Sequence, residues 1–551
     1  MRLLAVGALA TITAASLAAI RPAVLTDAER GAARAVDERR MRADIRFLSS
    51  DLLEGRFPGT RGDRLARAYL ASRFEAIGLE PAGGGSWEQA LELVGVSASC
   101  PPAMRVSRGT SGEDLRFPGD YVAFSGVQAP EARVEDAEIV FVGHGIVAPE
   151  HGWNDFKGED LRGRVLLVLN DEPDDDPLLF AGKRRLYYGR WDYKLDMAAR
   201  LGAAGAILVH TDASAGYGWP VVQASFTGEQ LGLPAADGPS LPVKAWVTEE
   251  AGRRIVALAG RDLTALRAAA GRRDFRPVRL GVRMSLRLTN QVTHRASANV
   301  VGLLRGRDPD LAKETVVYTA HHDHLGTRPG PSGEPVVYNG ALDNASGLAA
   351  LLAVAEAFAA APEPPRRSVI FAAVGAEEQG LLGSEELARR PPFGRPVANI
   401  NIDGVNVWGR TRDVPVVGLG KSTLDDWIRA VAEAQGRTVV PEASPEKGAY
   451  YRSDHLSFAR RGVPAAYVDA GTDVIGRPPG WGEERQRSWE AAHYHQPTDD
   501  LADDWDLSGA VEDARLLFFL GAKVADAPLA PSWRPGDEFE AAGKGADGGR
   551  R

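Results

Sequence analysis

The stretch VVYTAHHDHLGTRPGPSGEPVVYNGALDN, residues 316–344, decides how the rest of this sequence is interpreted. An apolar, β-prone run leads directly into the HHDH segment, and a Gly/Pro-rich loop then separates it from Asp343, which opens a predicted helix. Residues two apart in an extended chain face the same side, so His321 and Asp323 are expected to point together. One imidazole nitrogen can then bind a cation while a carboxylate holds the proton on the other. On its own, the stretch is equally consistent with a polar loop.

Composition sets limits on the kind of protein. The chain has 551 residues, of which 44% are hydrophobic and 25% charged, and its formal net charge is −9. These values are ordinary for a globular protein that is long enough for more than one core. Because there is no excess of basic residues to neutralise phosphates, nucleic acid and anionic membrane surfaces are excluded as expected partners.

The first residues indicate export. Residues 1–20, MRLLAVGALATITAASLAAI, combine one arginine with an Ala/Leu-rich run and predict a signal peptide, with a retained membrane anchor as the alternative. Cys100 is the single cysteine, so no internal disulfide can form. We therefore expect a periplasmic or secreted protein without stable membrane insertion after cleavage. The sequence contains no indication of oligomeric state.

The pattern changes along the chain. Residues 26–79 are predicted to be largely helical, interrupted by the EGRFPGTRG turn at 54–62, and residues 115–283 contain short β runs separated by turns. The acidic loop at 170–177 is interpreted as a solvated charge run, with a calcium site as the alternative. After Asn299, strands and helices alternate, which predicts an α/β fold with a sheet sandwiched by helices.

The expected elements of this last part follow from its apolar runs and periodicity. The predicted strands are Val300–Leu304, Val316–Thr319, Val369–Val374, Ala398–Ile402, Val414–Val417 and Ala465–Asp469, and the predicted helices are Ala345–Ala360, Leu382–Arg389, Leu424–Gln435 and Leu507–Val524. Residues 526–551 are rich in Gly, Pro and charge, and are predicted to be disordered.

Acidic and imidazole side chains follow several of these strands. His321, the pair Glu377 and Glu378, and Asp403 all fall at predicted strand ends, where open α/β sheets gather ligands and catalysts. Asp343 and a later histidine, His495, complete a set of two imidazoles and three carboxylates. Such a set suits two zinc ions that share one bridging carboxylate, whereas the same acids without cations would repel one another.

These segments carry a family resemblance. HHDHLG, NGALDN, GAEEQG, NIDG and YHQPTD resemble the corresponding segments of the co-catalytic di-zinc aminopeptidase family, which also contains glutamate carboxypeptidases. Residues 137–230, with FVGHGIVAPE, LRGRVLLV and AARLGAAGAILVH, resemble the protease-associated domain inserted in many members. The resemblance implies a zinc-exopeptidase-like mixed sheet with an inserted, smaller β-rich α/β domain. Its expected divisions are residues 30–110 and 296–525 for the peptidase domain, and 115–285 for the insertion.

The resemblance also implies roles for individual residues. His321 and Asp403 would bind one zinc ion, Glu378 and His495 the other, and Asp343 would bridge the two, with a cis bond between Asp343 and Asn344. Glu377 would be the general base that activates a metal-bridging water as hydroxide. Asp323 would support His321, and Tyr494 would donate to the developing oxyanion.

Other residues leave alternatives open. Residues 451–454 (YRSD) are expected in a polar turn that either faces substrate or is structural, and His322, His324, His455 and His493 are interpreted as hydrogen-bonded loop histidines. The leading function is an exported di-zinc aminopeptidase acting on peptides. A carboxypeptidase or dipeptidase using the same metals, a glutaminyl cyclase, and a non-catalytic receptor-like binding protein are the alternatives.

Overall fold

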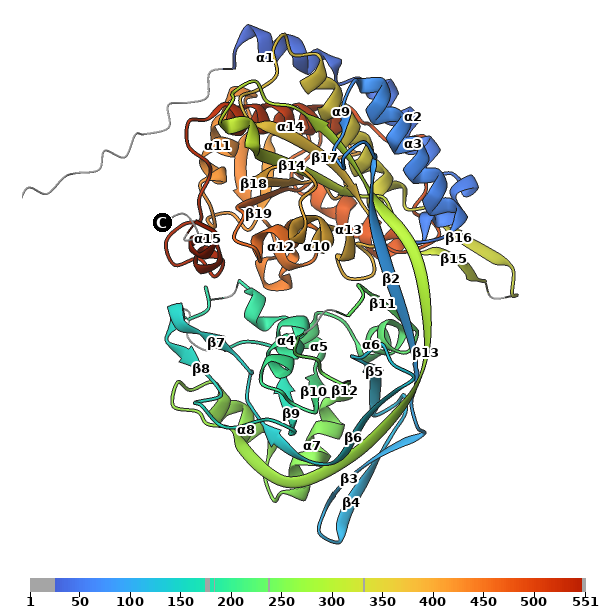
Figure 1. The fold of residues 1–551 in the computed structure, drawn as a ribbon, viewed down its shortest axis with the longest axis vertical. Helices are drawn as coiled ribbons and strands as arrows, with labels where there is room; N and C mark the ends of the chain where they lie inside the picture. Colours follow the sequence, from blue (N-terminus) through green and yellow to red (C-terminus); the bar gives the residue numbers. More distant parts are fainter. Residues whose placement is uncertain (1–24, 174–178, 183, 236–237, 331, 548–551) are drawn as a thin grey trace, which may run out of the picture.

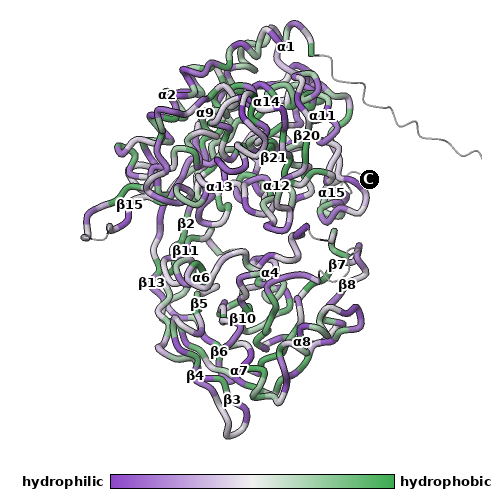
Figure 2. The backbone as a smooth tube through the Cα atoms, turned by 180° about the vertical axis from the view of Figure 1, so that it is seen from behind, coloured by the Kyte–Doolittle hydropathy of each residue, from purple (hydrophilic) through white to green (hydrophobic). Residues whose placement is uncertain are grey.

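The computed structural model describes residues 25–547 except 174–178, 183, 236–237 and 331, so the predicted signal segment at 1–20 lies outside the described residues. The chain forms two lobes (Figure 1), seen from behind in Figure 2. The upper lobe of Figure 1 contains residues 25–87 and 300–547, and the lower lobe contains residues 100–277. Two long strands, β2 (Glu88–Ser99) and β13 (Val278–Leu304), pair with each other and connect the lobes along one side.

A mixed sheet forms the centre of the upper lobe. Its strands are, in spatial order, the last residues of β13, then β17 (Ser368–Val374), β14 (Glu314–His321), β18 (Arg395–Asn401), β21 (Ala465–Val468), β19 (Asp413–Val417) and β20 (Thr438–Pro441). Four neighbouring strands are parallel to one another: β17, β14, β18 and β21. β13 pairs antiparallel with β17, and β19 pairs antiparallel with β21. The carboxyl ends of the four parallel strands therefore meet at one edge.

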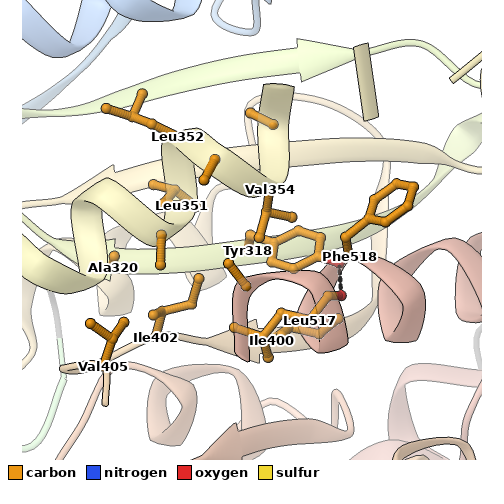
Figure 3. Close-up of a cluster of buried hydrophobic side chains, with 14 of the residues drawn as sticks. Tyr318, Ala320, Leu351, Leu352, Val354, Ile400, Ile402, Val405, Leu517 and Phe518 are labelled. Atoms are coloured by element: carbon orange, nitrogen blue, oxygen red, sulfur yellow. Dashed lines mark hydrogen bonds between the residues drawn. The ribbon is translucent and has the colours of Figure 1, made fainter. Parts of the chain in front are cut away.

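Helices cover both faces of this sheet, which confirms the predicted fold class. α9 (Gly347–Ala359), α11 (Leu424–Ala434) and α14 (Ser508–Asp526) share one core with the sheet, and α10 (Leu382–Arg389) and α12 (His455–Ala459) belong to the core on the other face. Successive residues of β14 alternate accordingly, since Tyr318 enters the first core and Val317 the second. Tyr318 lies near α14, where its hydroxyl donates to the carbonyl of Leu517 at 2.7 Å (Figure 3).

The predicted helices of this lobe and five of its six predicted strands are present with end shifts of a few residues, whereas the predicted strand Val300–Leu304 is the end of the much longer β13. α13 (Trp481–His493) was not predicted, because only Gly482 of its residues is buried and no apolar stripe marks it. The N-terminal part forms α1 (Asp27–Ala32), α2 (Glu38–Leu48) and α3 (Arg61–Ile77), and α3 ends at Gly78 in the left-handed conformation. A hairpin of β15 (Gly326–Pro329) and β16 (Pro335–Tyr338) projects from the lobe in both views (Figures 1 and 2).

One helical stretch among the described residues, Ala341–Ala359, is apolar and long enough to cross a membrane by composition. It is 89% buried inside the protein, and residues of α9 such as Leu351, Leu352 and Val354 pack onto the sheet (Figure 3). This stretch is therefore buried to the extent expected of a core helix of the upper lobe.

The lower lobe is a smaller α/β unit. Its strands are β3 (Ala103–Arg108), β4 (Ser111–Arg116), β5 (Tyr121–Ser125), β6 (Glu131–Phe141), β7 (Val147–Ala148), β8 (Trp153–Asn154), β9 (Val165–Leu169), β10 (Gly205–His210), β11 (Glu229–Gly232) and β12 (Val243–Thr248). Its helices are α4 (Trp191–Arg200), α5 (Asp212–Ala215), α6 (Trp219–Phe226), α7 (Glu249–Leu258) and α8 (Leu263–Ala270). β6, β9, β10 and β12 form a parallel group, and separate apolar cores lie on the two faces.

The predicted boundary between the insertion and the catalytic part, at 285–296, falls inside one continuous strand. β13 pairs with β6 up to Thr289 and with β17 from Val300 onward, so the sheet passes from one lobe into the other without a linker. Buried and exposed residues alternate along 278–290, which is typical of a half-buried strand. The sequence of this stretch contains no turn signal that would mark the end of the strand.

The tail prediction was wrong for residues 526–547. Trp533 and Phe539 are buried in an apolar cluster with Tyr187 and Tyr188 of the lower lobe, and α15 (Glu540–Asp547) follows. Glu538 accepts hydrogen bonds from the Tyr187 amide at 2.9 Å and the Tyr451 hydroxyl at 2.6 Å. Composition indicated disorder because the average over the segment conceals its two anchoring aromatic residues.

Candidate metal centre

Five predicted ligands from distant parts of the chain meet at the carboxyl edge of the upper sheet. β14 ends at His321, while Glu378 and Asp403 follow β17 and β18 within a few residues. Asp343 lies in the segment Ala341–Ser346 that precedes α9, and His495 follows α13. Parallel neighbouring strands bring the first three together, because their carboxyl ends share one edge of the sheet.

The five side chains form two groups that share Asp343. His321 Nε2 lies 3.1 Å from one Asp343 oxygen and 3.2 Å from Asp403 Oδ1. His495 Nε2 lies 3.2 Å from the other Asp343 oxygen and 3.1 Å from Glu378 Oε2. Each imidazole nitrogen therefore faces two carboxylates, and each oxygen of Asp343 faces a different imidazole.

These distances fit two zinc ions. Two atoms bound at about 2.0 Å to one tetrahedral centre lie about 3.3 Å apart. The four nitrogen–oxygen separations, 3.1–3.2 Å, are close to such an edge. The donor types also fit, since neutral imidazole and carboxylate are zinc ligands. His321, Asp343 and Asp403 are thus suited to one ion, and His495, Asp343 and Glu378 to the other.

The electrostatics of these side chains are also consistent with bound cations. Burial of His495 favours its neutral form, but Glu378 and Asp343 outweigh it and raise the pKa of His495 to about 10. Burial opposes ionisation of Glu378 too, yet His495 and His324 lower the pKa of Glu378 to about 2. For His321, Glu377, Asp343 and Asp403 overcome burial and raise its pKa well above the ordinary value. The acids thus draw positive charge into the centre, as bound cations would supply it.

Asp323 has a different contact from the predicted one. Its carboxylate accepts hydrogen bonds from the main-chain amides of Glu377 at 3.0 Å and Glu378 at 3.3 Å. His321 Nδ1 lies 3.2 Å from the Asp323 carbonyl oxygen and 3.9 Å from its carboxylate. Asp323 therefore holds His321 through its main chain and fixes the Glu377–Glu378 turn through its side chain.

Glu377 and Tyr494 line a cleft over the two groups. Burial, together with Glu378, Asp403 and Asp454, raises the pKa of Glu377 well above its usual value, although His321 opposes this shift. Tyr494 stacks on His495 with ring centroids 4.0 Å apart. Desolvation at the cleft wall and the nearby carboxylates raise the pKa of Tyr494 well above 10, although 52% of the residue is exposed, so its hydroxyl remains a donor at neutral pH.

The rest of the cleft combines aromatic, acidic and basic side chains. The further lining residues are Leu342, Gly404, Val405, Trp408, Lys447, Ala449, Arg452, Ser453, Tyr467, Asp469, Ala470, Gln486, Trp489 and Glu490. Within the YRSD turn, Arg452 and Ser453 therefore reach the cleft, whereas Tyr451 and Asp454 are buried beside it. The cleft thus combines apolar walls with polar and charged side chains that can fix the orientation of a ligand.

The four histidines interpreted above as loop histidines, His322, His324, His455 and His493, differ in their contacts. His324 Nδ1 lies 2.8 Å from Glu378 Oε1, His322 Nε2 lies 3.0 Å from Asp63, and His493 Nδ1 lies 2.9 Å from a carbonyl oxygen. His324 could join Asp343 and Glu378 around an ion. We assign it to orienting Glu378, because His495 faces both carboxylates at zinc-like distances. His455 is fully buried and packs against the rings of Tyr450 and Tyr467.

Two positioning residues were missed by sequence reasoning. Asp499 accepts hydrogen bonds from the amides of Leu342 at 2.9 Å and Asp343 at 3.1 Å. Asn344, joined to Asp343 by a cis bond as expected, accepts from the Gly404 amide at 2.9 Å and donates to the Ile402 carbonyl at 3.0 Å. The sequence offered one signal for each residue: Asn344 lies beside a predicted ligand in NGALDN, and Asp499 lies near one in YHQPTDD.

Comparison with known proteins identifies similar chains. Residues 299–518, less than half of the chain, match the family "Peptidase family M28". Aminopeptidase NAALADL1 of Mus musculus is 30% identical over 176 residues, which cover 27% of this chain and 22% of that protein. Aminopeptidase YwaD of Bacillus subtilis (strain 168) is 27% identical over 219 residues, which cover 38% of this chain and 41% of that protein. The chain thus spans less than half the length of these curated relatives.

Among solved structures, an aminopeptidase from Aneurinibacillus sp. strain AM-1 superposes with a TM-score of 0.48 at 19% identity, covering 92% of this chain and 98% of that one.

Proposed function

From the match of residues 299–518 to peptidase family M28, we propose that this chain is a zinc-dependent exopeptidase, and specifically an aminopeptidase that removes N-terminal residues from peptides. The observation that carries the proposal is the pair of histidine–carboxylate groups sharing Asp343, next to a glutamate outside both groups. His321 and Asp403 would hold one zinc ion, His495 and Glu378 the other, and Asp343 both. Bound zinc would polarise the peptide carbonyl and make water a stronger acid.

The chain's own residues supply the proton transfers. Glu377 lies in the cleft outside both ligand groups, so its carboxylate is free to take a proton from water and return it to the leaving amine. Because Asp323 fixes the main chain at Glu377, the carboxylate can be held in place without taking part in ligation. The Tyr494 hydroxyl, protonated at neutral pH, is suited to donate to the oxygen that gains negative charge.

Acidic residues in the cleft favour reading of the amino terminus. Asp469 and Glu490 both line the cleft near the proposed metals and can pair with a substrate ammonium group. Arg452 favours the second candidate, a carboxypeptidase or dipeptidase. Its guanidinium also lines the cleft, and among the described residues no ion pair neutralises it. A substrate carboxylate could occupy that position.

The lower lobe is proposed to be a protease-associated domain that limits access to the cleft. Arg190 and Arg185 of this lobe lie close enough to Arg452 to lower its pKa, after the larger effect of burial. Residues of the lower lobe thus lie near Arg452, which lines the cleft. We also propose that the protein is exported, on the basis of residues 1–20.

Zinc analysis combined with Glu377→Gln tests the proposal. The wild type should contain about two zinc ions per chain and hydrolyse aminoacyl substrates in a chelator-sensitive manner. Glu377→Gln should keep the zinc and lose about 10²–10⁴-fold in turnover, the range for a general base. Dipeptides and N-blocked peptides, assayed in parallel, separate the two candidates. Absence of zinc from the wild type, or wild-type turnover by Glu377→Gln, would contradict the proposal.

A further inference from the structure

Behind the metal centre lies a fully buried arginine that pairs with main-chain carbonyl groups. Arg56 Nε donates to the His322 carbonyl at 2.8 Å. Its Nη1 donates to the carbonyl oxygens of Leu48 and of Asn339, the latter at 2.6 Å, and its Nη2 donates to that of Gly340 at 3.0 Å. No carboxylate forms an ion pair with it among the described residues. The guanidinium therefore uses its planar set of donors to join three separate segments of chain.

The EGRFPGTRG turn is shaped to deliver this side chain. Glu54, Gly55 and Arg56 have consecutive positive φ values of 51°, 68° and 53°, a left-handed turn between α2 and α3. A Cβ at Gly55 would lie 2.5 Å from the Gly326 carbonyl oxygen and 2.6 Å from that of Tyr338, at the base of the β15–β16 hairpin. Only glycine allows this approach, and the turn then directs Arg56 inward.

The joined segments are those that carry metal ligands. His322 lies between His321 and Asp323, and Gly340 precedes Asp343 by three residues. The arginine thus bonds simultaneously to the loop of the first proposed ligand and to the loop of the bridging one. The His321–Asp343 separation, 3.1 Å, depends on how these two loops are held relative to each other.

Arg56 also remains charged at neutral pH. Burial lowers the pKa of Arg56 to about 10, while Asp323, Asp499, Asp343 and Glu378 act in the opposite direction. A buried cation this close to the centre would, by charge alone, oppose the binding of further cations. Removal of Arg56 therefore distinguishes two roles. If Arg56 mainly braces the loops, metal affinity should fall, whereas if it mainly repels cations, metal affinity should rise.

We propose that Arg56 is a positioning residue of the metal centre, which sets the spacing of His321 and Asp343 by tying their loops together from behind. The inference rests on the proposed zinc site. It assigns a function to a sequence motif that lies more than 250 residues from the ligands it serves.

The test compares Arg56→Met, Arg56→Lys and a matched control, Arg367→Met. Arg367 is also fully buried in the upper lobe, and it donates to main-chain carbonyl groups as Arg56 does, though to two and not four. Unlike Arg56, it pairs with a carboxylate, that of Glu314, and it lies at the opposite end of β17 from the metal edge. Zinc affinity of the purified chain is measured by competition with a chromophoric chelator. Hydrogen exchange of amides 320–324 and 339–343 is measured on metal-free protein.

Arg56→Met should weaken zinc binding about 10- to 100-fold, the range for loss of a group that orients ligands, and should speed exchange in both loops. Arg56→Lys, which keeps the charge but has fewer donors, should be intermediate. Arg367→Met should lower thermal stability without changing zinc affinity.

Equal or tighter zinc binding by Arg56→Met would overturn the inference, as would an equal loss in Arg367→Met. Should Arg56→Met not fold, the same comparison is made with Arg56→Lys, and unchanged affinity in that variant would overturn it. Failure of the wild type to bind zinc would instead refute the proposed function, and the exchange measurement would still decide whether Arg56 braces the loops.

Discussion

Zinc binding should release about two protons per chain at pH 7.5. In the metal-free centre the neighbouring carboxylates raise the pKa of His495 to about 10 and that of His321 well above its ordinary value, so we expect both rings to be protonated. Both must be neutral to bind zinc. Histidines with an ordinary pKa near 6.5 would carry only about 0.1 proton each at this pH. The expected release is therefore about ten times that of unperturbed ligands.

Isothermal titration calorimetry measures this number directly. Zinc is titrated into metal-free protein in buffers of different ionisation enthalpy, and the slope of apparent enthalpy against buffer enthalpy gives the protons released. Glu377→Gln is the preferred background, because the raised pKa of Glu377 can add a further proton. Any other group that ionises with the metal also increases the number. A release below one proton per chain would show that the carboxylates do not hold both imidazoles protonated, and would refute the electrostatic account.

Three further predictions concern stability, each measured by urea unfolding. Burial raises the pKa of Glu172 from 4.5 to about 8, so the folded state retains a proton that the unfolded state loses, and stability falls as pH rises through that window. Glu172→Gln should flatten this fall and stabilise the protein by about 2–4 kcal/mol at pH 8.5, and an unchanged profile would contradict the assignment. Glu538→Ala should cost about 2–4 kcal/mol, because it leaves the buried Lys421 with Asp537 as its remaining carboxylate partner among the described residues; a loss under about 0.5 kcal/mol would mean that the tail contributes little. Tyr318→Phe should cost about 1 kcal/mol through the lost hydrogen bond to α14, and no loss would indicate that water replaces it.

Much of the candidate centre could be predicted from the sequence, because three of its proposed ligands follow buried strands. His321, Glu378 and Asp403 each come within a few residues of an apolar run that periodicity identifies as a strand. Parallel strands place their carboxyl ends together whatever the loops contain. The fold class could be predicted from the same periodicity of apolar residues. Convergence of the three side chains therefore followed from the order of strands and helices.

Other features are invisible to local patterns. β13 crosses both lobes because its alternation continues without a break, and only its two sets of partners reveal where one lobe ends. The tail is held by two aromatic residues and Glu538, whose partners in the lower lobe lie about 350 residues away. Contacts of this kind depend on tertiary packing, which composition and periodicity do not describe.

The geometry of the centre depends on a second set of contacts, which use the main chain of the ligand loops. Arg56 bonds to carbonyl groups beside His321 and Asp343, Asp499 bonds to the Asp343 amide, and Asn344 connects this loop with the one that carries Asp403. Every residue has such amides and carbonyls, so no residue type in the loops indicates which of them will be used. The proposed ligands can therefore be picked out from the sequence, whereas their spacing cannot. Substitution of a ligand should remove an ion, and substitution of a bracing residue should leave both sites present but weaker.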